Sequence, residues 1–150
     1  MEKRFNKSAA VILIIIFSVT VFPYRIKIFP DDFSFKNEKI NIFENYYKIS
    51  DEKIRILICD TLYEFTEITG YPYSYYNGVY NSTEDIIIIL PEDVLRKKNR
   101  YERVIVHECF HHYLTKYFSM NKSEQEKFIE DIYNSENPIK IIKKIEPLKK

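Results

Sequence analysis

The residues of this chain best suited to bind a metal ion are three histidines, and all three lie in the segment Val106–Leu114 (VHECFHHYL). His107 and His111 are four positions apart, and Glu108 directly follows His107. Residues four apart on an α-helix lie on one face, one turn from each other. The two imidazole rings could therefore hold one metal ion, with the Glu108 carboxylate within reach of a water molecule on that ion. The spacing predicts metal-assisted hydrolysis with Glu108 as the catalytic general base.

The alternative interpretation is an ordinary surface helix that happens to carry polar side chains. Two neighbouring features favour the catalytic interpretation. An apolar Val104-Ile105-Val106 precedes the histidines, so the helix is expected to be buried there, as a central active-site helix must be. A hydrophobic segment, Asp85–Leu90 (DIIIIL), lies upstream and is rich in β-branched residues, which favour a strand.

A third metal ligand is required, because a catalytic zinc ion typically holds three protein ligands and one water. No cysteine follows Cys109 and no histidine lies outside the segment, so the third ligand must be a carboxylate. The downstream candidates are Glu124, Glu126, Glu130, Asp131 and Glu136.

The expected helix pairing favours Glu130 among these carboxylates. If the motif helix ends near Phe118 and the next begins near Ser123, the two form an antiparallel hairpin that places Glu130 level with His111. Glu126 is the alternative ligand, one turn nearer the loop, but Ser123-x-x-Glu126 also fits a helix-capping box. We therefore predict that His107, His111 and Glu130 bind a Zn²⁺ cofactor.

The segment from Ser50 to Asn134 resembles the gluzincins, a group of zinc metallopeptidases that carry H-E-x-x-H. In that family an edge strand precedes the motif helix and a glutamate on the following helix completes the metal site. The resemblance implies that this chain hydrolyses peptide bonds in a peptide or protein substrate, and that Glu130 has the role of that glutamate. The substrate would lie extended beside Asp85–Leu90 as an added antiparallel strand. It is not a metzincin, because no H-E-x-x-H-x-x-G-x-x-H occurs.

The N-terminus has the pattern of an export segment. Lys3, Arg4 and Lys7 precede the uncharged run Ala9–Phe22, which predicts a signal-anchor or a signal peptide over residues 1–23. As a helix the run would be about 21 Å long, against a hydrocarbon core of about 30 Å. No A-x-A cleavage site follows it, which favours an uncleaved anchor. Either form would place residues 24–150 outside the cytoplasm, and a buried core segment is the remaining alternative.

Secondary-structure patterns in residues 24–150 predict an α+β fold, with a small, mostly antiparallel sheet packed on the motif helix and on a following glutamate helix. The expected elements are a strand in Tyr24–Phe29, an amphipathic helix over Asp51–Thr69 ended by Gly70, a hairpin in Tyr73–Asn81 turning at Asn77-Gly78, a strand in Asp85–Leu90, and helices from about Arg100 and from Ser123 to Asn134.

Composition narrows the choice of partner. The formal net charge of +1 gives no support to a nucleic-acid partner, which would favour a strong basic excess. Two cysteines are too few for a disulfide framework, and we expect Cys59 and Cys109 to be small buried residues, with a single bridge as the alternative. The rival function is a membrane-anchored interaction module whose metal site is vestigial or non-catalytic, since about 120 residues leave little room for substrate pockets.

Overall fold

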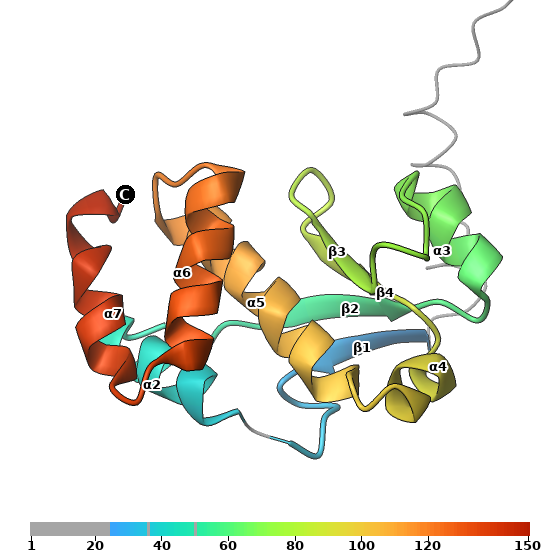
Figure 1. Ribbon diagram of the computed structural model, residues 1–150, viewed down its shortest axis with the longest axis horizontal. Coiled ribbons are helices and arrows are strands. Elements are labelled where there is room, and N and C mark those ends of the chain that lie inside the picture. The colour runs from blue at the N-terminus through green and yellow to red at the C-terminus, as the bar shows by residue number, and fades with distance from the viewer. Residues whose placement is uncertain (1–24, 36, 50) are drawn as a thin grey trace, which may run out of the picture.

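The computed structural model describes residues 25–35, 37–49 and 51–150, and this part of the chain is α+β (Figure 1). Its four-stranded sheet has the order β1-β2-β4-β3. The strands are β1 (Ile26–Phe29), β2 (Ile54–Ile58), β3 (Gly78–Asn81) and β4 (Ile86–Ile89). The two outer pairs, β1–β2 and β3–β4, are antiparallel, but the central pair β2–β4 is parallel. The α+β prediction is thus confirmed, and the sheet, expected to be mostly antiparallel, is mixed, with a parallel central pair.

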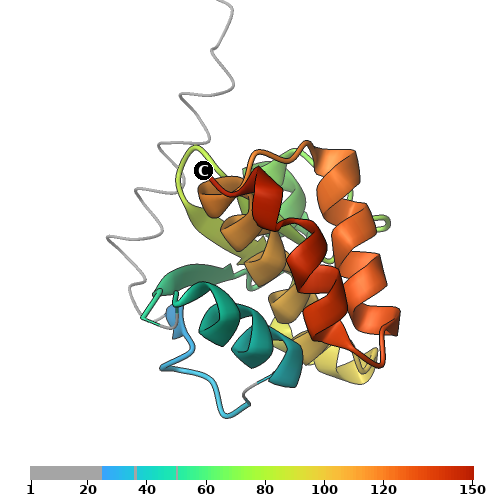
Figure 2. The same cartoon turned by 90° about the vertical axis from the view of Figure 1, so that its left-hand side faces the viewer.

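Six α-helices accompany the sheet within the described residues. They are α2 (Glu38–Tyr47), α3 (Leu62–Thr69), α4 (Glu92–Lys97), α5 (Tyr101–Tyr117), α6 (Lys122–Asn134) and α7 (Pro138–Lys144), followed by the 3₁₀ turn Glu146–Leu148. The helix α5 packs against β3 and β4, and α6 packs on α5 (Figure 1). The helices α7 and α2 complete this helical side of the molecule, with α7 packed on both α6 and α2 (Figure 2). The predicted motif helix and the helix after it are both present.

The strand β4 confirms the prediction for Asp85–Leu90, but it is not an edge strand. Its four isoleucines, Ile86–Ile89, are all buried, because β2 and β3 flank them and α5 covers them. Both hydrogen-bonding edges of β4 are occupied, so a substrate cannot add beside it as the sequence suggested. The exposed edge next to the motif helix belongs to β3.

The predicted helix over Asp51–Thr69 is wrong in its first half. Residues Ile54–Ile58 form β2 instead, and only Leu62–Thr69 is helical, capped at its start by the Thr61 side chain and ended by Gly70 at φ +73°. Parallel pairing with β4 buries Ile54, Ile56 and Leu57 in the sheet. This tertiary burial outweighs the helical spacing of the same apolar residues.

The predicted turn at Asn77-Gly78 is also wrong. The β3–β4 hairpin turns at Ser82–Asp85, where the Asn81 side chain accepts hydrogen bonds from the backbone N–H groups of Thr83 (3.0 Å) and Glu84 (3.2 Å). Asp85 takes the left-handed conformation at φ +50°. Gly78 is the first residue of β3 rather than a turn residue. Glycine suits this position because β3 packs closely on Val104 and Glu108 of α5.

The predicted membrane segment Ala9–Phe22 and the boundary at residue 23 lie outside the described residues. Among the helices that the structure describes, none is both long and apolar enough to cross a membrane. Both cysteines fall within the described part, and both are buried and free, as expected. Burial raises the pKa of the Cys59 thiol to about 12 and that of Cys109 well above its ordinary value.

Candidate metal centre

The helix α5 presents His107 and His111 to the same side, as their spacing predicted. Their Nε2 atoms lie 3.2 Å apart. The His111 ring is buried, with 8% of the residue exposed, and His107 is partly exposed. Because α5 is buried along most of its length, the helix holds both rings in fixed positions at its boundary with α6.

The residue that faces the two histidines from α6 is Glu126. Its Oε2 lies 3.4 Å from His107 Nε2, and its Oε1 lies 3.2 Å from His111 Nε2. The three groups offer ligand atoms that all lie within 4.8 Å of one another. Tetrahedral zinc with bonds of about 2.0–2.1 Å separates its ligand atoms by about 3.3–3.4 Å. The spacing and the donor set of His107, His111 and Glu126 therefore fit a zinc ion.

The predicted ligand Glu130 is not among these clustered groups and is exposed, one turn further along α6. Glu126, the alternative ligand expected from sequence, faces the histidines instead, because α6, which begins at Lys122, is inclined to α5 (Figure 1). The predicted capping box is also displaced by two residues. Asn121 and Glu124 cap the helix, with the Glu124 carboxylate 2.7 Å from the Asn121 backbone N–H. Glu126 therefore has no capping role and its carboxylate faces α5.

Gln125 fixes the orientation and tautomer of His111, a role that no pattern in the sequence indicates. The amide nitrogen of Gln125 donates to the carbonyl of Met120 (3.1 Å) and to Thr115 Oγ1 (3.2 Å). Its carbonyl oxygen is thereby directed at His111 Nδ1, at 2.8 Å. Since that oxygen only accepts, Nδ1 carries the proton, and the lone pair of His111 is on Nε2. Such a hydrogen bond to the distal nitrogen is the usual support of a metal-binding histidine.

The surroundings of His107 and of Glu108 both favour the neutral form of the side chain. Burial, the neighbouring His111 and Arg103 lower the pKa of His107, against the opposing effect of Glu126. Burial raises the pKa of Glu108 to about 8, and nearby Glu126 adds to it, although a hydrogen bond from the Tyr80 backbone acts in the opposite direction. A raised pKa near neutrality suits a group that must both accept and donate a proton.

Gly78 allows β3 to approach the motif helix closely. A Cβ atom at this position would lie 2.8 Å from Val104 Cγ1, nearer than real Cβ atoms approach, and 3.0 Å from Glu108 Cγ, which is also tight. A side chain here would therefore force β3 or the Val104 and Glu108 side chains to move. The absence of a side chain at Gly78 therefore lets the edge strand β3 pack directly against Glu108, the predicted general base.

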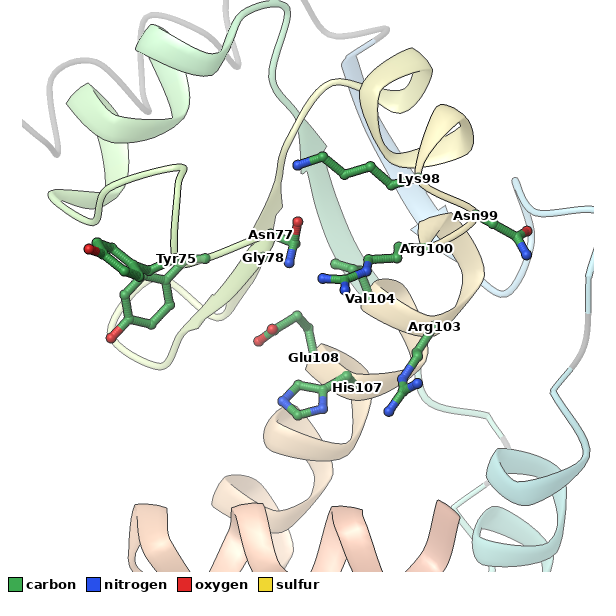
Figure 3. A pocket seen from close by; sticks show the side chains of 11 residues that line it. Tyr75, Asn77, Gly78, Lys98, Asn99, Arg100, Arg103, Val104, His107 and Glu108 are labelled. Carbon is green, nitrogen blue, oxygen red and sulfur yellow. The ribbon is translucent and has the colours of Figure 1, made fainter. Parts of the chain in front are cut away.

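Two clefts meet at this centre, and both are lined by Gly78, His107 and Glu108. The larger, of about 500 Å³, extends past Asn77 toward the α4–α5 turn (Figure 3). The smaller, of about 260 Å³, lies toward Val79, Tyr80 and Glu126. Tyrosines line both clefts: Tyr75 and Tyr76 line the larger cleft, and Tyr71, Tyr76 and Tyr80 line the smaller.

His112, the third histidine, faces away from the centre. Its Nε2 lies 3.1 Å from Glu52 Oε1, to which it donates a hydrogen bond. Its Nδ1 is 2.9 Å from Asp85 Oδ1, without the alignment of a hydrogen bond. Its ring also packs edge-on against Tyr80 at 5.3 Å. His112 thus ties α5 to the segment before β2 and to the β3–β4 turn.

A scan against models of known protein families, a search of curated proteins and a search of solved structures each found no match for this chain. The functional assignment therefore rests on the geometry of the residues themselves.

Proposed function

We propose that this protein is a zinc-dependent metallopeptidase. The observation that carries the proposal is the convergence of His107 Nε2, His111 Nε2 and the Glu126 carboxylate, at 3.2–3.4 Å spacings, beside the buried carboxyl of Glu108. Two imidazoles and one carboxylate leave a fourth tetrahedral position open, as in catalytic rather than structural zinc sites. The Gln125 hydrogen bond to His111 supports the same assignment.

A zinc ion held by His107, His111 and Glu126 would supply a Lewis acid that acidifies water and polarises a carbonyl. Glu108 accepts a proton from the attacking water and returns it to the nitrogen of the departing amine. One water is consumed, the C–N bond breaks, and the products are a carboxylate and an amine. Glu108 is largely buried beside Gly78 and lines both clefts, so its carboxyl faces the space that a substrate would occupy.

The edge strand β3 supports binding of an extended peptide. Its outer edge is free of strand partners within the described sheet, and it lies against Glu108 at Gly78. A peptide that adds as an antiparallel strand to this edge would place one carbonyl over the metal centre. Substrate recognition would then use main-chain hydrogen bonds to β3 and side-chain contacts in the two clefts.

The proposal includes attachment to a membrane outside the cytoplasm. It rests on the sequence alone, namely the basic residues Lys3, Arg4 and Lys7 before the apolar run Ala9–Phe22. Fractionation of cells that express the full chain tests it. Recovery in the membrane fraction with the C-terminal part accessible to external protease is expected, and recovery in the cytosol would contradict it.

Zinc content and catalysis are tested separately with the purified full chain. We expect one equivalent of zinc by elemental analysis and cleavage of a mixed peptide pool by mass spectrometry. Glu108→Gln should retain the zinc and lose hydrolysis by about 10²–10⁴-fold, because the amide accepts no proton. A chain that binds zinc but cleaves no peptide would favour the interaction module with a non-catalytic metal site.

The identity of the third ligand gives a matched pair of variants on α6. Glu126→Ala should weaken zinc affinity by about 100-fold or more, since loss of a group that merely supports a ligand already costs about 10–100-fold. Glu130→Ala, one turn further along α6 and outside the cluster, should leave the affinity unchanged. Competition with a chromogenic chelator measures both. The reverse result would restore the register expected from sequence.

A further inference from the structure

The larger cleft carries an excess of positive charge. Lys98, Arg100 and Arg103 line it, and among the described residues that line it the only acidic side chain is Glu108. Within residues 25–35, 37–49 and 51–150, none of these three cations forms an ion pair with a carboxylate. Some described surface cations, such as Lys97 and Lys127, form such pairs, whereas Lys143 and Lys144 do not and lie outside this cleft. The larger cleft is distinguished by having three such cations side by side in its lining. The cleft therefore holds cations whose counter-charge the fold does not supply.

A tight backbone turn positions two of these cations. The turn between α4 and α5 has Asn99 at φ +53°, with hydrogen bonds from Asn99 N–H to the Arg96 carbonyl (2.9 Å) and from Arg100 N–H to the Leu95 carbonyl (2.9 Å). This pair of bonds is the Schellman ending of a helix, which fixes the turn. Lys98 and Arg100 extend from it toward Asn77 and Gly78 at the start of β3 (Figure 3).

Arg103 links this basic region to the metal centre. It lies four residues before His107 and therefore on the same face of α5, one turn away. Its guanidinium also lies 5.4 Å from the centre of the Tyr133 ring on α6, a contact that restrains it. The cations thus begin one turn from the proposed ligands and continue outward along the cleft.

Strand direction decides which part of a substrate would reach this cleft. The strand β3 runs from Gly78 to Asn81, so an antiparallel peptide enters at Asn81 and leaves at Gly78. The smaller cleft, with Val79, Tyr80 and Glu126, lies at the entry side, and the larger cleft continues past Asn77 at the exit side. Residues that follow the scissile bond would therefore lie among Lys98, Arg100 and Arg103.

We propose that the larger cleft is a subsite for a negatively charged carboxylate on the C-terminal side of the scissile bond. This inference rests on the proposed peptidase function, because that function determines which side of the scissile bond lies in the larger cleft. The carboxylate can come from an acidic side chain or from the free C-terminus of a short peptide. In either form it would supply the counter-charge that Lys98, Arg100 and Arg103 lack within the fold.

Three fluorescently labelled peptides that share the sequence before the cleavage site distinguish an acidic side chain from a free C-terminus as the source of the carboxylate. One carries glutamate after the cleavage site and an amidated C-terminus, one carries glutamine with a free C-terminus one or two residues later, and the baseline carries glutamine with an amidated C-terminus. Binding is measured by fluorescence polarisation with the full zinc-loaded chain carrying Glu108→Gln, so that peptide is not consumed. Cleavage of the same peptides is measured with Glu108 intact.

We expect at least one carboxylate peptide to bind about tenfold more tightly than the baseline, with an advantage that shrinks as salt increases. The double substitution Lys98→Gln and Arg100→Gln should abolish that advantage. Its matched control, Lys143→Gln and Lys144→Gln on the distant helix α7, removes the same charge and should preserve it. The more tightly bound of the two carboxylate peptides identifies the source.

Equal binding of all three peptides, no measurable binding of either carboxylate peptide, or equal loss in the two double variants would overturn the subsite. Failure of the peptidase function has a different signature. In that case the carboxylate preference and its loss with Lys98 and Arg100 would remain in the binding measurement, while the chain with Glu108 intact would cleave none of the peptides.

Discussion

Two adjacent histidines on α5, His111 and His112, have opposite environments. His111 uses Nδ1 to bind Gln125 and directs Nε2 at Glu126 and His107, beside a cleft. His112 has a side chain that is 1% exposed, with Nε2 bound to Glu52 and Nδ1 beside Asp85. Successive residues on a helix point about 100° apart, so one turn of α5 serves both faces.

The difference bears on the proposed metal site, because a buried histidine can bind a metal only where one ring nitrogen keeps an available lone pair. At His111 the protein engages one nitrogen and leaves the lone pair of the other directed at an acidic group and a second imidazole. At His112 carboxylates lie against both nitrogens, and Glu52 also accepts hydrogen bonds from Lys116 and Tyr117. Residue type is the same, and the surrounding donors and acceptors decide between a ligand and a structural link.

The largest expected contrast comes from removing each ring in turn. His111→Ala should lower zinc affinity by about 100-fold or more, because it removes a direct ligand. His112→Ala should keep the zinc but reduce the free energy of unfolding by about 2–3 kcal/mol, since it withdraws a partner from the largely buried Glu52 carboxylate. Chelator competition and urea unfolding measure the two effects. Zinc loss in His112→Ala would show that the two faces are not independent.

A smaller effect is expected from the group that supports His111. Gln125→Leu should weaken zinc binding by about 10–100-fold, because nothing then holds the proton on Nδ1. Gln125→Glu keeps an acceptor oxygen for Nδ1 but loses the donors to Met120 and Thr115, so its zinc affinity should fall between those of Gln125→Leu and the unchanged chain. If both variants bind zinc equally well, the hydrogen bond at 2.8 Å does not prepare the ligand.

The smallest expected effect is a pH-dependent one on the His112 side. Burial opposes ionisation of Glu52, but hydrogen bonds from Lys116, Tyr117 and His112 lower its pKa below the ordinary value of 4.5. A lowered folded pKa contributes stability above pH 4.5, and this contribution is lost as the pH falls through the folded value. Glu52→Gln should therefore cost about 1–2 kcal/mol at pH 7 and less in acid.

Urea unfolding of both chains at neutral and acid pH measures this difference. The exposed Glu136→Gln is the matched control and should show no change at either pH. A cost for Glu52→Gln that stays constant from pH 7 to acid would mean that ionisation of Glu52 does not stabilise the fold.

The sequence predicted the parts of the site that depend on local spacing. His107, Glu108 and His111 lie as expected, because an α-helix fixes relations four residues apart whatever surrounds it. Glu126 was only the alternative ligand, because its place depends on the α5–α6 loop and on the angle between the helices. Gln125 has no distinguishing pattern at all. The strand β4 was likewise predicted from its consecutive isoleucines. The strand β2 was not, because its conformation depends on pairing with β4, which local spacing does not indicate.

The state of the two cysteines has a consequence for the thiol chemistry open to the folded protein. The reactive form of a cysteine is the thiolate, and burial keeps both Cys59 and Cys109 protonated at neutral pH. Neither side chain is joined to another in the described structure. Within the described structure, the folded core thus offers no reactive thiolate to an oxidant and no disulfide bond to a reductant.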